Sequence, residues 1–576
     1  MKMSIFKVNK TFRCIFLIFS IVLFSACGSG GKVSDPPQAP QPTITAKSEK
    51  VIIEWENIND AFFYNIYWDD KPGVSINSVN KVKVEKLTTE IEGLSNDTTY
   101  YFIVTAVGDG NESETSIELV ATPIAVPGAP VNLKASPGDN ALKLSWEEVN
   151  QASEYHIFVT NIEDNSTNSD PIISTEISHT LDNLENGKKY KILIKAINGS
   201  GESTETIIEE AVPTSIITLA AGSEHTCVIK SDHSLWCWGN NSEGEIGDGT
   251  KEMRTSPVRV GEDNDWTKIA LGLQYSCATK LDHSLWCWGD NSETQLGDAT
   301  LDEIFVPTQI DLGHDVESLN LASQTQTTCE IDTLNTLYCW GQNFWGQAGS
   351  DTYDTPVAPA QVGEEGEWSS VTVGALHGCA IKLNGTLWCW GANYLGQLGN
   401  GTYVGTIAPL AIGELENWQF TSVGSSESCV INDEGDLWCW GFNASGQLGD
   451  GTEDLQGTPV AIAEEESWSS VSIGGGAFTC AIHTDKSLWC WGDNASGQLG
   501  DGSLDNKNTP YQIDAGNDWA IIQTGDSHAC ALKTSGDLYC WGKGASGQLG
   551  VADMVDITSD SPWLLEPTLV EFSDAP

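Results

Sequence analysis

Seven pairs of cysteines recur along the C-terminal part of the chain at an almost constant interval. The partners of each pair are 10 residues apart, successive pairs begin 50 to 52 residues apart, and the second cysteine is always followed by Trp-Gly. A period near 50 with several short strands per repeat is typical of radial β architectures, in which each repeat forms one wedge of a ring. The pairs are Cys227 with Cys237, Cys277 with Cys287, Cys329 with Cys339, Cys379 with Cys389, Cys429 with Cys439, Cys480 with Cys490, and Cys530 with Cys540.

The residues between paired cysteines indicate a β-hairpin. From Cys227 to Cys237 the turn centres on Asp232, which sets the two cysteines opposite each other on antiparallel strands. Opposed residues have Cβ atoms about 4.5–5.5 Å apart, closer at non-hydrogen-bonded positions, so a disulfide fits there with little strain. Side-chain alternation gives the hairpin two apolar faces, one with the cysteines, Ile229 and Leu235, and the other with Val228, Trp236 and Trp238.

A second motif follows each Trp-Gly and carries a family resemblance. It reads Trp-Gly-x-Asn-x-x-Gly-Gln-Leu-Gly, as at Gly396 to Gly399 and Gly497 to Gly500. These repeats resemble those of the regulator of chromosome condensation family, which implies a seven-bladed β-propeller over residues 214–576. The third repeat is the most divergent, with Ala348 in place of Leu. We expect the tail from Pro567 to Phe572 to supply the last strand, next to the first repeat at Ile216 to Ala220.

Two earlier segments, 43–123 and 129–213, show period-two alternation typical of half-buried strands. Each has a tryptophan on an early strand, Trp55 or Trp146, and later a Leu-x5-Tyr motif that ends at Tyr100 or Tyr190. These features resemble fibronectin type III domains, in which the tyrosine hydroxyl bonds to backbone at a strand corner. The predicted fold is therefore all-β, with two fibronectin type III-like β-sandwiches before a seven-bladed β-propeller.

The N-terminus resembles a bacterial lipoprotein signal peptide over residues 1–27. A basic start precedes the apolar stretch from Cys14 to Phe24, and Ser25-Ala26-Cys27 then resembles a lipobox, which implies lipidation at Cys27. An ordinary cleaved signal with an incidental cysteine is the alternative. Residues 28–42 are a Gly/Ser/Pro-rich flexible tether. We therefore expect a bacterial envelope location, as an outer membrane lipoprotein that contacts the membrane through its lipid only.

The cysteine count agrees with export. Of 16 cysteines, Cys14 leaves with the signal and Cys27 takes lipid, so the 14 paired ones remain. Disulfides form in oxidising compartments. The alternative, structural zinc, favours Cys-x2-4-Cys pairs gathered in one cluster, whereas these pairs have nine intervening residues and are spread around a ring. We predict seven disulfides, no metal and no cofactor.

The net charge of −52 makes nucleic acid an unlikely partner, because the chain repels phosphate backbones. Its ordinary interpretation is solubility; the alternative is an acidic site that selects cationic partners. The sequence contains no Gly-x-Ser-x-Gly or His-Glu-x-x-His motif, and carboxylates are too abundant for one pair to stand out as an acid/base couple. His225, His377 and His528 lie two places before a cysteine, where other repeats carry unrelated residues, so we interpret that position as packing. We predict no catalytic residue.

Function is expected where the repeats differ, in the loops after the Gly-Gln-Leu-Gly motif. Four aromatic residues there are candidate contact residues, although each is equally compatible with packing under its own loop: Phe305, Tyr353, Tyr403 and Trp563. We predict a monomeric, anchored recognition or scaffold protein that binds a protein or glycan through propeller loops. The alternatives are an extracellular hydrolase with two loop carboxylates, an architectural role, and guanine-nucleotide exchange activity, which only the family resemblance implies.

Overall fold

The computed structural model describes residues 35–572 except 110, 169, 300–303, 322–323, 365, 415–416, 464–465 and 552–562. The predicted signal peptide, with its lipidation residue Cys27, and residues 28–34 of the tether lie outside the described residues. The described residues form strands and no helix, so none of them forms a helix able to cross a membrane. Contacts divide the chain into two compact units, Met1–Pro127 with Asn198–Glu202, and Gly128–Ile197 with Ser203–Pro576.

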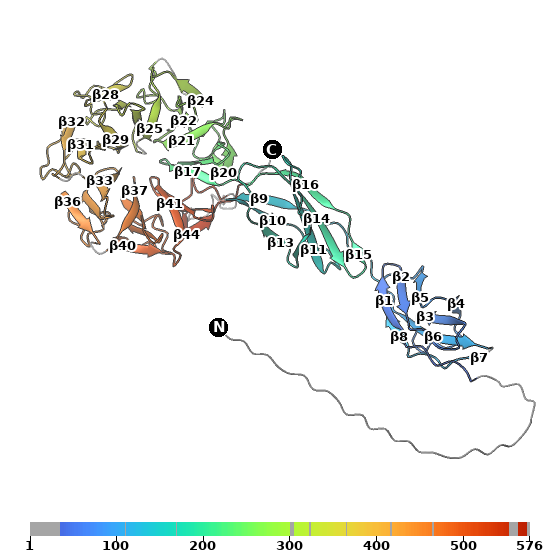
Figure 1. Ribbon diagram of the computed structural model, residues 1–576. Helices are drawn as coiled ribbons and strands as arrows, with labels where there is room; N and C mark the ends of the chain where they lie inside the picture. Colours follow the sequence, from blue (N-terminus) through green and yellow to red (C-terminus); the bar gives the residue numbers. More distant parts are fainter. Residues whose placement is uncertain are drawn as a thin grey trace, which may run out of the picture. The chain divides into compact units, whose positions relative to one another are not determined.

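The first unit contains a sandwich of two sheets, in strand order β1-β2-β5 and β4-β3-β6-β7, with β8 added to β6 (Figure 1). Its core packs Trp55 against Tyr64, with ring centroids 5.2 Å apart. The Tyr100 hydroxyl accepts a hydrogen bond from the backbone N–H of Ser95, the corner bond that the resemblance implied. The strands are β1 (Thr43–Lys47), β2 (Lys50–Glu54), β3 (Phe63–Asp69), β4 (Asn80–Val84), β5 (Thr88–Glu92), β6 (Tyr100–Gly108), β7 (Asn111–Glu112) and β8 (Leu119–Ala121).

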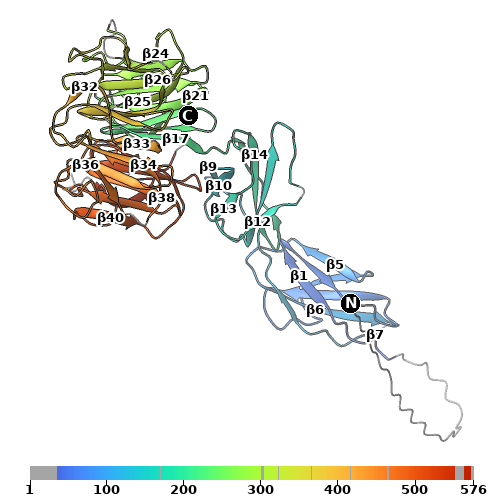
Figure 2. The same cartoon turned by 60° about the vertical axis from the view of Figure 1, so that its left-hand side comes forward.

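The second sandwich repeats this plan with sheets β13-β10-β9 and β12-β11-β14-β15, and β16 pairs with β14 (Figure 2). Trp146 packs against Tyr155, and the Tyr190 hydroxyl accepts a hydrogen bond from the backbone N–H of Glu185. The strands are β9 (Lys134–Gly138), β10 (Ala141–Ser145), β11 (Glu154–Asn161), β12 (Ile172–Ser174), β13 (Ser178–Leu181), β14 (Tyr190–Asn198), β15 (Gly201–Glu202) and β16 (Thr206–Ala211).

The remaining described strands form seven antiparallel four-stranded sheets, and we number these sheets as blades 1 to 7 in chain order. Their first strands contact one another in sequence, and the first strand of blade 1 also contacts that of blade 7, so the blades close a ring (Figure 1). The all-β prediction with a seven-bladed propeller is therefore confirmed.

Blade 1 contains β17 (Ile216–Ala221), β18 (His225–Lys230), β19 (Leu235–Gly239) and β20 (Arg254–Arg259), and blade 2 contains β21 (Trp266–Leu271), β22 (Tyr275–Lys280), β23 (Leu285–Gly289) and β24 (Ile304–Ile310). Blade 3 contains β25 (Val316–Leu321), β26 (Thr327–Asp332), β27 (Leu337–Gly341) and β28 (Ala360–Val362), and blade 4 contains β29 (Trp368–Val373), β30 (His377–Lys382), β31 (Leu387–Gly391) and β32 (Thr406–Ala411). Blade 5 contains β33 (Trp418–Val423), β34 (Glu427–Asn432), β35 (Leu437–Gly441) and β36 (Gln456–Ile462). Blade 6 contains β37 (Trp468–Gly474), β38 (Phe478–His483), β39 (Leu488–Gly492) and β40 (Lys507–Ile513). Blade 7 contains β41 (Trp519–Thr524), β42 (His528–Lys533), β43 (Leu538–Lys543) and β44 (Trp563–Leu569).

The tail supplies the last strand of the ring, but the neighbour predicted for it was wrong. Strand β44 pairs with β43 inside blade 7, whereas Ile216 to Ala221 form the first strand of blade 1 and pair with β18. Each blade is thus a continuous segment of chain. The segment beyond β44 reaches blade 1, where the Phe572 ring packs 6.0 Å from Trp236.

The hairpin interpretation of the cysteine pairs agrees with the strand register. Cys227 is opposite Cys237 and Val228 is opposite Trp236, and the two cysteine Cα atoms are 4.1 Å apart, as at a non-hydrogen-bonded position. The cysteine face of one blade packs against the tryptophan of the next Trp-Gly motif, as Cys227 and Cys237 do with Trp288.

Each of the seven predicted cysteine pairs forms a disulfide within its own blade, between the second and third strands. All fourteen cysteines are completely buried, so the bonds lie inside the propeller. From blade 1 to blade 7 the bonds join Cys227 to Cys237, Cys277 to Cys287, Cys329 to Cys339, Cys379 to Cys389, Cys429 to Cys439, Cys480 to Cys490, and Cys530 to Cys540.

Hydrogen bonds between neighbouring blades explain the two repeated motifs together. The indole N–H of every Trp-Gly tryptophan donates to the backbone carbonyl in the Gly-Gln-Leu-Gly motif of the preceding blade, at 2.8–3.0 Å. The last glycine of that motif has a positive φ and lies against the same indole, so a Cβ at Gly399 would be 2.7 Å from the Trp440 nitrogen. A glycine is therefore needed there for both conformation and space.

Candidate functional site

The four predicted contact residues fall into two classes. Tyr353 and Tyr403 are 61% and 53% exposed, in the loops between the third and fourth strands of blades 3 and 4. Phe305 and Trp563 are half-buried at the beginning of the fourth strands of blades 2 and 7. The two tyrosines are therefore exposed to solvent, and the other two are less exposed.

Phe305 packs against the preceding blade. Its ring lies so close to Gly244 that a Cβ there would be 2.4 Å from the Phe305 Cδ1 atom, and the Lys251 ammonium lies 5.1 Å from its ring centroid. Trp563 is paired opposite Lys543 in blade 7. The side chain of Phe305 thus fills the seam between blades 1 and 2, as the packing alternative for these aromatic residues allowed.

Three further aromatic residues lie in the Trp-Gly-x-Asn-x-x-Gly turn of blades 3 and 4. The two x positions before its final glycine are Phe344 and Trp345 in blade 3, and the first of them is Tyr394 in blade 4. Blades 5 to 7 carry Ala-Ser at both positions, and blades 1 and 2 carry Ser-Glu. At these two positions, aromatic side chains are therefore restricted to two neighbouring blades.

The motif asparagine holds this loop in place. In blade 4 the Asn393 amide nitrogen donates to the backbone carbonyls of Thr402 and Val404, at 2.9 and 3.2 Å. Its oxygen accepts from the backbone N–H of Leu398 at 3.0 Å. Because one buried side chain joins both ends of the loop, the neighbouring aromatic residues are presented on a fixed backbone.

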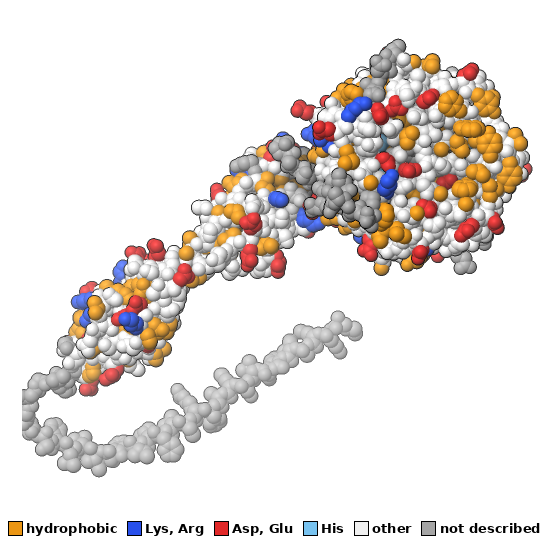
Figure 3. All heavy atoms as spheres, turned by 180° about the vertical axis from the view of Figure 1, so that it is seen from behind, with side chains coloured by type: hydrophobic (Ala, Val, Ile, Leu, Met, Phe, Trp, Pro, Cys, Tyr) orange, Lys and Arg blue, Asp and Glu red, His pale blue; other side chains and the backbone are white. Residues whose placement is uncertain are grey.

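We call the five residues Phe344, Trp345, Tyr353, Tyr394 and Tyr403 the aromatic surface. Their exposed fractions run from 43% to 62%. The rings of Trp345 and Tyr394 meet edge to face at 5.6 Å, which joins the two blades. Figure 3 shows hydrophobic side chains gathered at the end of the propeller where β28 and β32 lie in Figure 1. Exposed apolar clusters of this kind mark binding surfaces, and tryptophan and tyrosine are enriched among residues that dominate binding energy.

Sequence reasoning missed Phe344, Trp345 and Tyr394 because they lie inside the repeated motif. The predicted contact residues Tyr353 and Tyr403 lie instead in the stretches after Gly-Gln-Leu-Gly, which differ between repeats. Aligning the seven copies of the motif by position would have separated Phe-Trp and Tyr-Leu from Ala-Ser and Ser-Glu. The signal is the departure of two copies from the others at positions that the fold leaves exposed.

Groups with strongly shifted pKa values lie inside the propeller. Burial lowers the pKa of His225 and His377 to about 3 and that of His528 to about 4. The Nε2 atoms of His225 and His377 contact Ser276 and Ser428 of the next blade, at 2.9 and 2.7 Å. These histidines therefore join blades, in line with the packing interpretation.

Three carboxyl groups have raised pKa values for the same reason. Burial raises the pKa of Glu245 and Glu427 to about 7 and that of Glu330 to about 9. Each is at most 1% exposed, and they lie in blades 1, 5 and 3 respectively. The part of the chain that the structure describes contains no group of three His, Cys, Asp or Glu residues placed to hold a metal ion.

Family models match the propeller and the second sandwich. The RCC1-like domain matches residues 197–477, and the Regulator of chromosome condensation (RCC1) repeat matches residues 468–498 and 519–548, with a second model of that name at 485–532 and 535–575. The fibronectin type III domain matches residues 128–211, the second sandwich.

Solved structures show the same propeller fold. Human WBSCR16 is 19% identical with a TM-score of 0.53, over 59% of this chain and 94% of that one. Yeast RCC1 (Prp20), solved with Kap60 bound, is 19% identical with a TM-score of 0.52, over 62% of this chain and 85% of that one. At this identity the likeness concerns the fold alone.

Two curated archaeal relatives match part of the chain. The Kelch domain-containing protein SSO1033 of Saccharolobus solfataricus is 28% identical over 205 residues, which are 32% of this chain and 27% of that protein. A Kelch domain-containing protein of Sulfurisphaera tokodaii is 28% identical over 178 residues, 29% of this chain and 23% of that protein. The chain thus spans about a quarter of the length of these relatives. Repeats of these kinds are those of protein-interaction scaffolds.

Proposed function

Since the chain contains an RCC1-like repeat propeller and a fibronectin type III domain, we propose that it is a non-catalytic recognition protein whose aromatic surface binds a protein partner. The observation that carries this proposal is the restriction of exposed aromatic residues in one repeated turn to blades 3 and 4, at Phe344, Trp345 and Tyr394. Residues that merely stabilised the blades would recur in the other copies of the turn.

The chemistry of the surface favours a protein over other ligands. Interfaces are enriched in aromatic residues at their centre and depleted of charged ones. The aromatic surface matches this composition, although the chain as a whole carries a net charge of −52. Yeast RCC1 (Prp20), whose propeller has the same fold, has been solved with the protein Kap60 bound.

We further propose that the protein is anchored in the bacterial envelope through lipid on Cys27. The apolar stretch before Ser25-Ala26-Cys27 and the Gly/Ser/Pro-rich residues 28–42 support a lipid anchor followed by a tether. The disulfide in each blade supports an oxidising compartment. Intact-mass analysis of the protein from membranes should show a diacylglyceryl group, and a Cys27→Ala variant should remain unprocessed and unlipidated.

A hydrolase is the competing function, and it requires two carboxyl groups in one cleft, with a raised pKa. The carboxyl groups with clearly raised pKa values, Glu245, Glu330 and Glu427, are instead buried in three different blades. A catalytic acid must reach its substrate. This distribution favours binding over hydrolysis.

Site-specific photo-crosslinking of the full-length protein tests the aromatic surface. A photoreactive phenylalanine at position 394 in blade 4 should crosslink a discrete protein species in envelope preparations. The same group at position 495, the matching exposed alanine of blade 6, should not. Mass spectrometry of the adduct identifies a protein, a glycan or no ligand.

Substitution then measures the contribution of the surface. Trp345→Ser in blade 3 combined with Tyr394→Ala in blade 4, each the residue that blades 5 to 7 carry at that position, should weaken binding of the crosslinked partner about 10- to 100-fold. Equal crosslinking from positions 394 and 495, or an adduct with glycan alone, would contradict a protein-binding aromatic surface.

A further inference from the structure

Several blades place one of their own lysines against a pair of aromatic rings. The Lys280 ammonium lies 4.7 and 4.3 Å from the ring centroids of Trp266 and Trp286 in blade 2. The Lys533 ammonium lies 4.6 and 5.4 Å from those of Trp519 and Tyr539 in blade 7. Lys382 and Lys230 are placed in the same way in blades 4 and 1. Contacts of this kind between an ammonium group and an aromatic face are attractive.

Carboxylates complete the arrangement in blades 2, 4 and 7, and in blade 4 the partner of Lys382 is Glu367. Lys280 pairs with Asp263 and Asp265 at 2.7 and 3.2 Å, and Lys533 pairs with Asp518 and Asp514 at 3.1 and 3.4 Å. The repeated unit is therefore an ammonium group held between two rings and at least one carboxylate.

Blade 6 keeps the rings and a carboxylate but has no lysine at this position. Trp468 and Trp489 are 6.3 Å apart, and the residue paired opposite Trp468 is His483, where the matching residue opposite Trp519 is Lys533. The imidazole Nε2 lies 2.9 Å from Glu466 and 3.0 Å from the backbone N–H of Ser467. The imidazole is shorter than a lysine side chain and carries no ammonium group to the rings.

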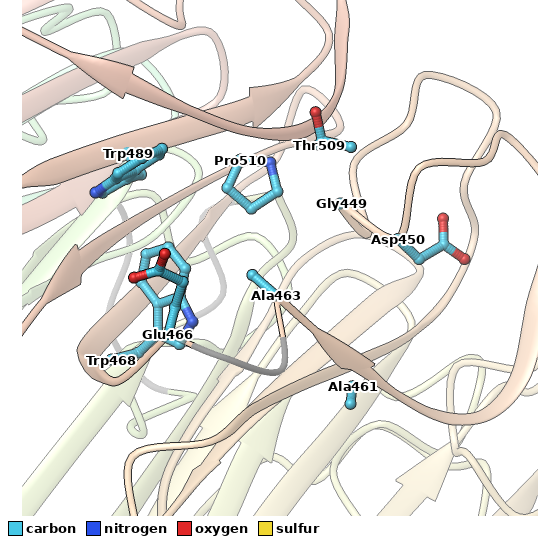
Figure 4. Close-up of a pocket in the computed structure, with 9 residues that line it drawn as sticks. All are labelled: Gly449, Asp450, Ala461, Ala463, Glu466, Trp468, Trp489, Thr509 and Pro510. Atoms are coloured by element: carbon cyan, nitrogen blue, oxygen red, sulfur yellow. The ribbon is translucent and has the colours of Figure 1, made fainter.

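A pocket of about 350 Å³ opens at this place, between blades 5 and 6. Figure 4 shows Trp468, Trp489 and Glu466 on one side of it and Asp450 on the other. Its remaining lining residues are small or uncharged: Gly449, Ala461, Ala463, Thr509 and Pro510. The pocket is therefore walled by two indoles and two carboxylates, with no lysine or arginine among its lining residues.

Among the described residues, the second carboxylate is not paired with a cation, unlike its counterparts in blades 1 and 6. In blade 1 the matching Asp248 pairs with Arg254 at 2.5 Å, and in blade 6 Asp501 pairs with Lys507 at 3.0 Å. Asp450 instead accepts a hydrogen bond from the neutral amide of Gln456 at 2.9 Å. The grooves between blades 1 and 2 and between blades 6 and 7 each contain two cationic side chains. In the groove between blades 5 and 6, His483 and Gln456 take their places.

We propose that the groove between blades 5 and 6 binds the ammonium group of a lysine side chain on a protein partner, in the place that the chain's own lysines take in blades 1, 2, 4 and 7. The rings of Trp468 and Trp489 contact the ammonium group and its methylenes, and Glu466 and Asp450 balance its charge. This site is separate from the aromatic surface and does not depend on the function proposed for it.

Calorimetric titration of the full-length protein with the tripeptide acetyl-Gly-Lys-Gly-amide tests the assignment. We expect saturable binding at one site, at least tenfold tighter than binding of the same tripeptide with norleucine, which has no charge. Trp489→Ala should weaken binding at least tenfold. His483→Lys should do the same, because it supplies the internal ammonium group that the sister blades have.

The reverse substitution provides the matched control. Lys533→His in blade 7 exposes Trp519, Tyr539 and Asp514 in the corresponding groove between blades 6 and 7, which also holds a pocket of about 350 Å³. This variant should bind a second equivalent of the tripeptide. Binding that is unchanged by His483→Lys, or equal for lysine and norleucine, would overturn the proposal. If butylammonium bound as tightly as the tripeptide, the groove would be a site for free amines, and the proposal of a protein partner would be overturned.

Discussion

The interiors of blades 4 and 6 are built alike, whereas their solvent-exposed side chains differ. Each has one disulfide, and in each the Trp-Gly indole, Trp390 or Trp491, donates to a carbonyl of the preceding blade. On the surface, Tyr394 of blade 4 corresponds to Ala495 of blade 6. In the groove, Lys382 of blade 4 corresponds to His483.

Blades 4 and 6 differ in opposite ways at the loop and at the groove. Blade 4 adds exposed aromatic side chains and fills its own aromatic pair with a lysine, whereas blade 6 has a small loop residue and a groove that lacks the lysine. Residues shared by the blades therefore account for the fold, and residues that differ identify the candidate binding sites.

The largest expected effect concerns the shared interior. Trp390→Ala and Trp491→Ala should each lower the free energy of unfolding by about 3–5 kcal/mol, because each removes a fully buried indole together with its hydrogen bond to the preceding blade. Denaturant titration of the full-length protein measures this loss. Clearly unequal losses would show that the interiors of the two blades are not equivalent.

Removal of a disulfide should be the next largest effect. Replacing Cys379 and Cys389 by alanine, or Cys480 and Cys490, should cost about 2–3 kcal/mol by loop entropy, because both bonds close loops of the same length. The same denaturant titration, with and without reductant, provides the measurement. If reductant lowers the stability of native protein no further than one double substitution does, the seven bonds do not contribute independently.

Blade 1 differs from the other blades at one buried position of its interior. Glu245 occupies the position that is glutamine in the other six blades, and burial raises its pKa to about 7 from an ordinary value of 4.5. Its contribution to stability is present in full below about pH 4.5 and is lost as the pH rises through 7, because the folded state holds the proton more tightly than the unfolded state.

Glu245→Gln should therefore stabilise the protein at pH 8 by about 1–3 kcal/mol, since the neutral amide needs no proton. At pH 4 the two proteins should differ less. Thermal or denaturant unfolding at both pH values gives the comparison, with Gln397→Glu in blade 4 as the reciprocal variant. An effect of Glu245→Gln that is the same at both pH values would contradict burial of an ionisable group there.

The smallest expected effect concerns the exposed turn. Tyr394→Ala with Leu395→Ser gives blade 4 the turn of blade 6 and should change the free energy of unfolding by less than about 0.5 kcal/mol, since exposed side chains contribute little to stability. A loss above about 1 kcal/mol would mean that the aromatic surface serves the fold and not a partner.

Much of the fold could be predicted because its constraints are local. A separation of 10 residues between cysteines sets the register of a hairpin, and the structure pairs Cys227 with Cys237 as that register requires. The boundaries of a blade are not local, because a repeated sequence has the same period wherever it is divided. Trp266, for example, begins the first strand of blade 2.

The candidate sites could be predicted only in part. Tyr353 and Tyr403 lie in stretches that differ visibly between repeats, whereas Tyr394 lies within a motif that is otherwise constant. The groove between blades 5 and 6 assembles Asp450, Glu466 and Trp489 from different strands and loops, so no single stretch of sequence contains it. Only the replacement of a recurrent lysine by His483 would have pointed to it.

Every blade is built from one uninterrupted stretch of chain, so blades 7 and 1 share no strand at the point where the ring closes. Blades 7 and 1 meet through contacts such as the indole of Trp238 on the carbonyl of Gln548 and the imidazole of His528 on Thr226. The indole contact joins every other neighbouring pair in the same way, so the point at which the circle starts is arbitrary. Whole wedges could thus be duplicated, deleted or cyclically reordered during evolution without splitting a sheet, and the two binding sites could be moved around the circle one repeat at a time.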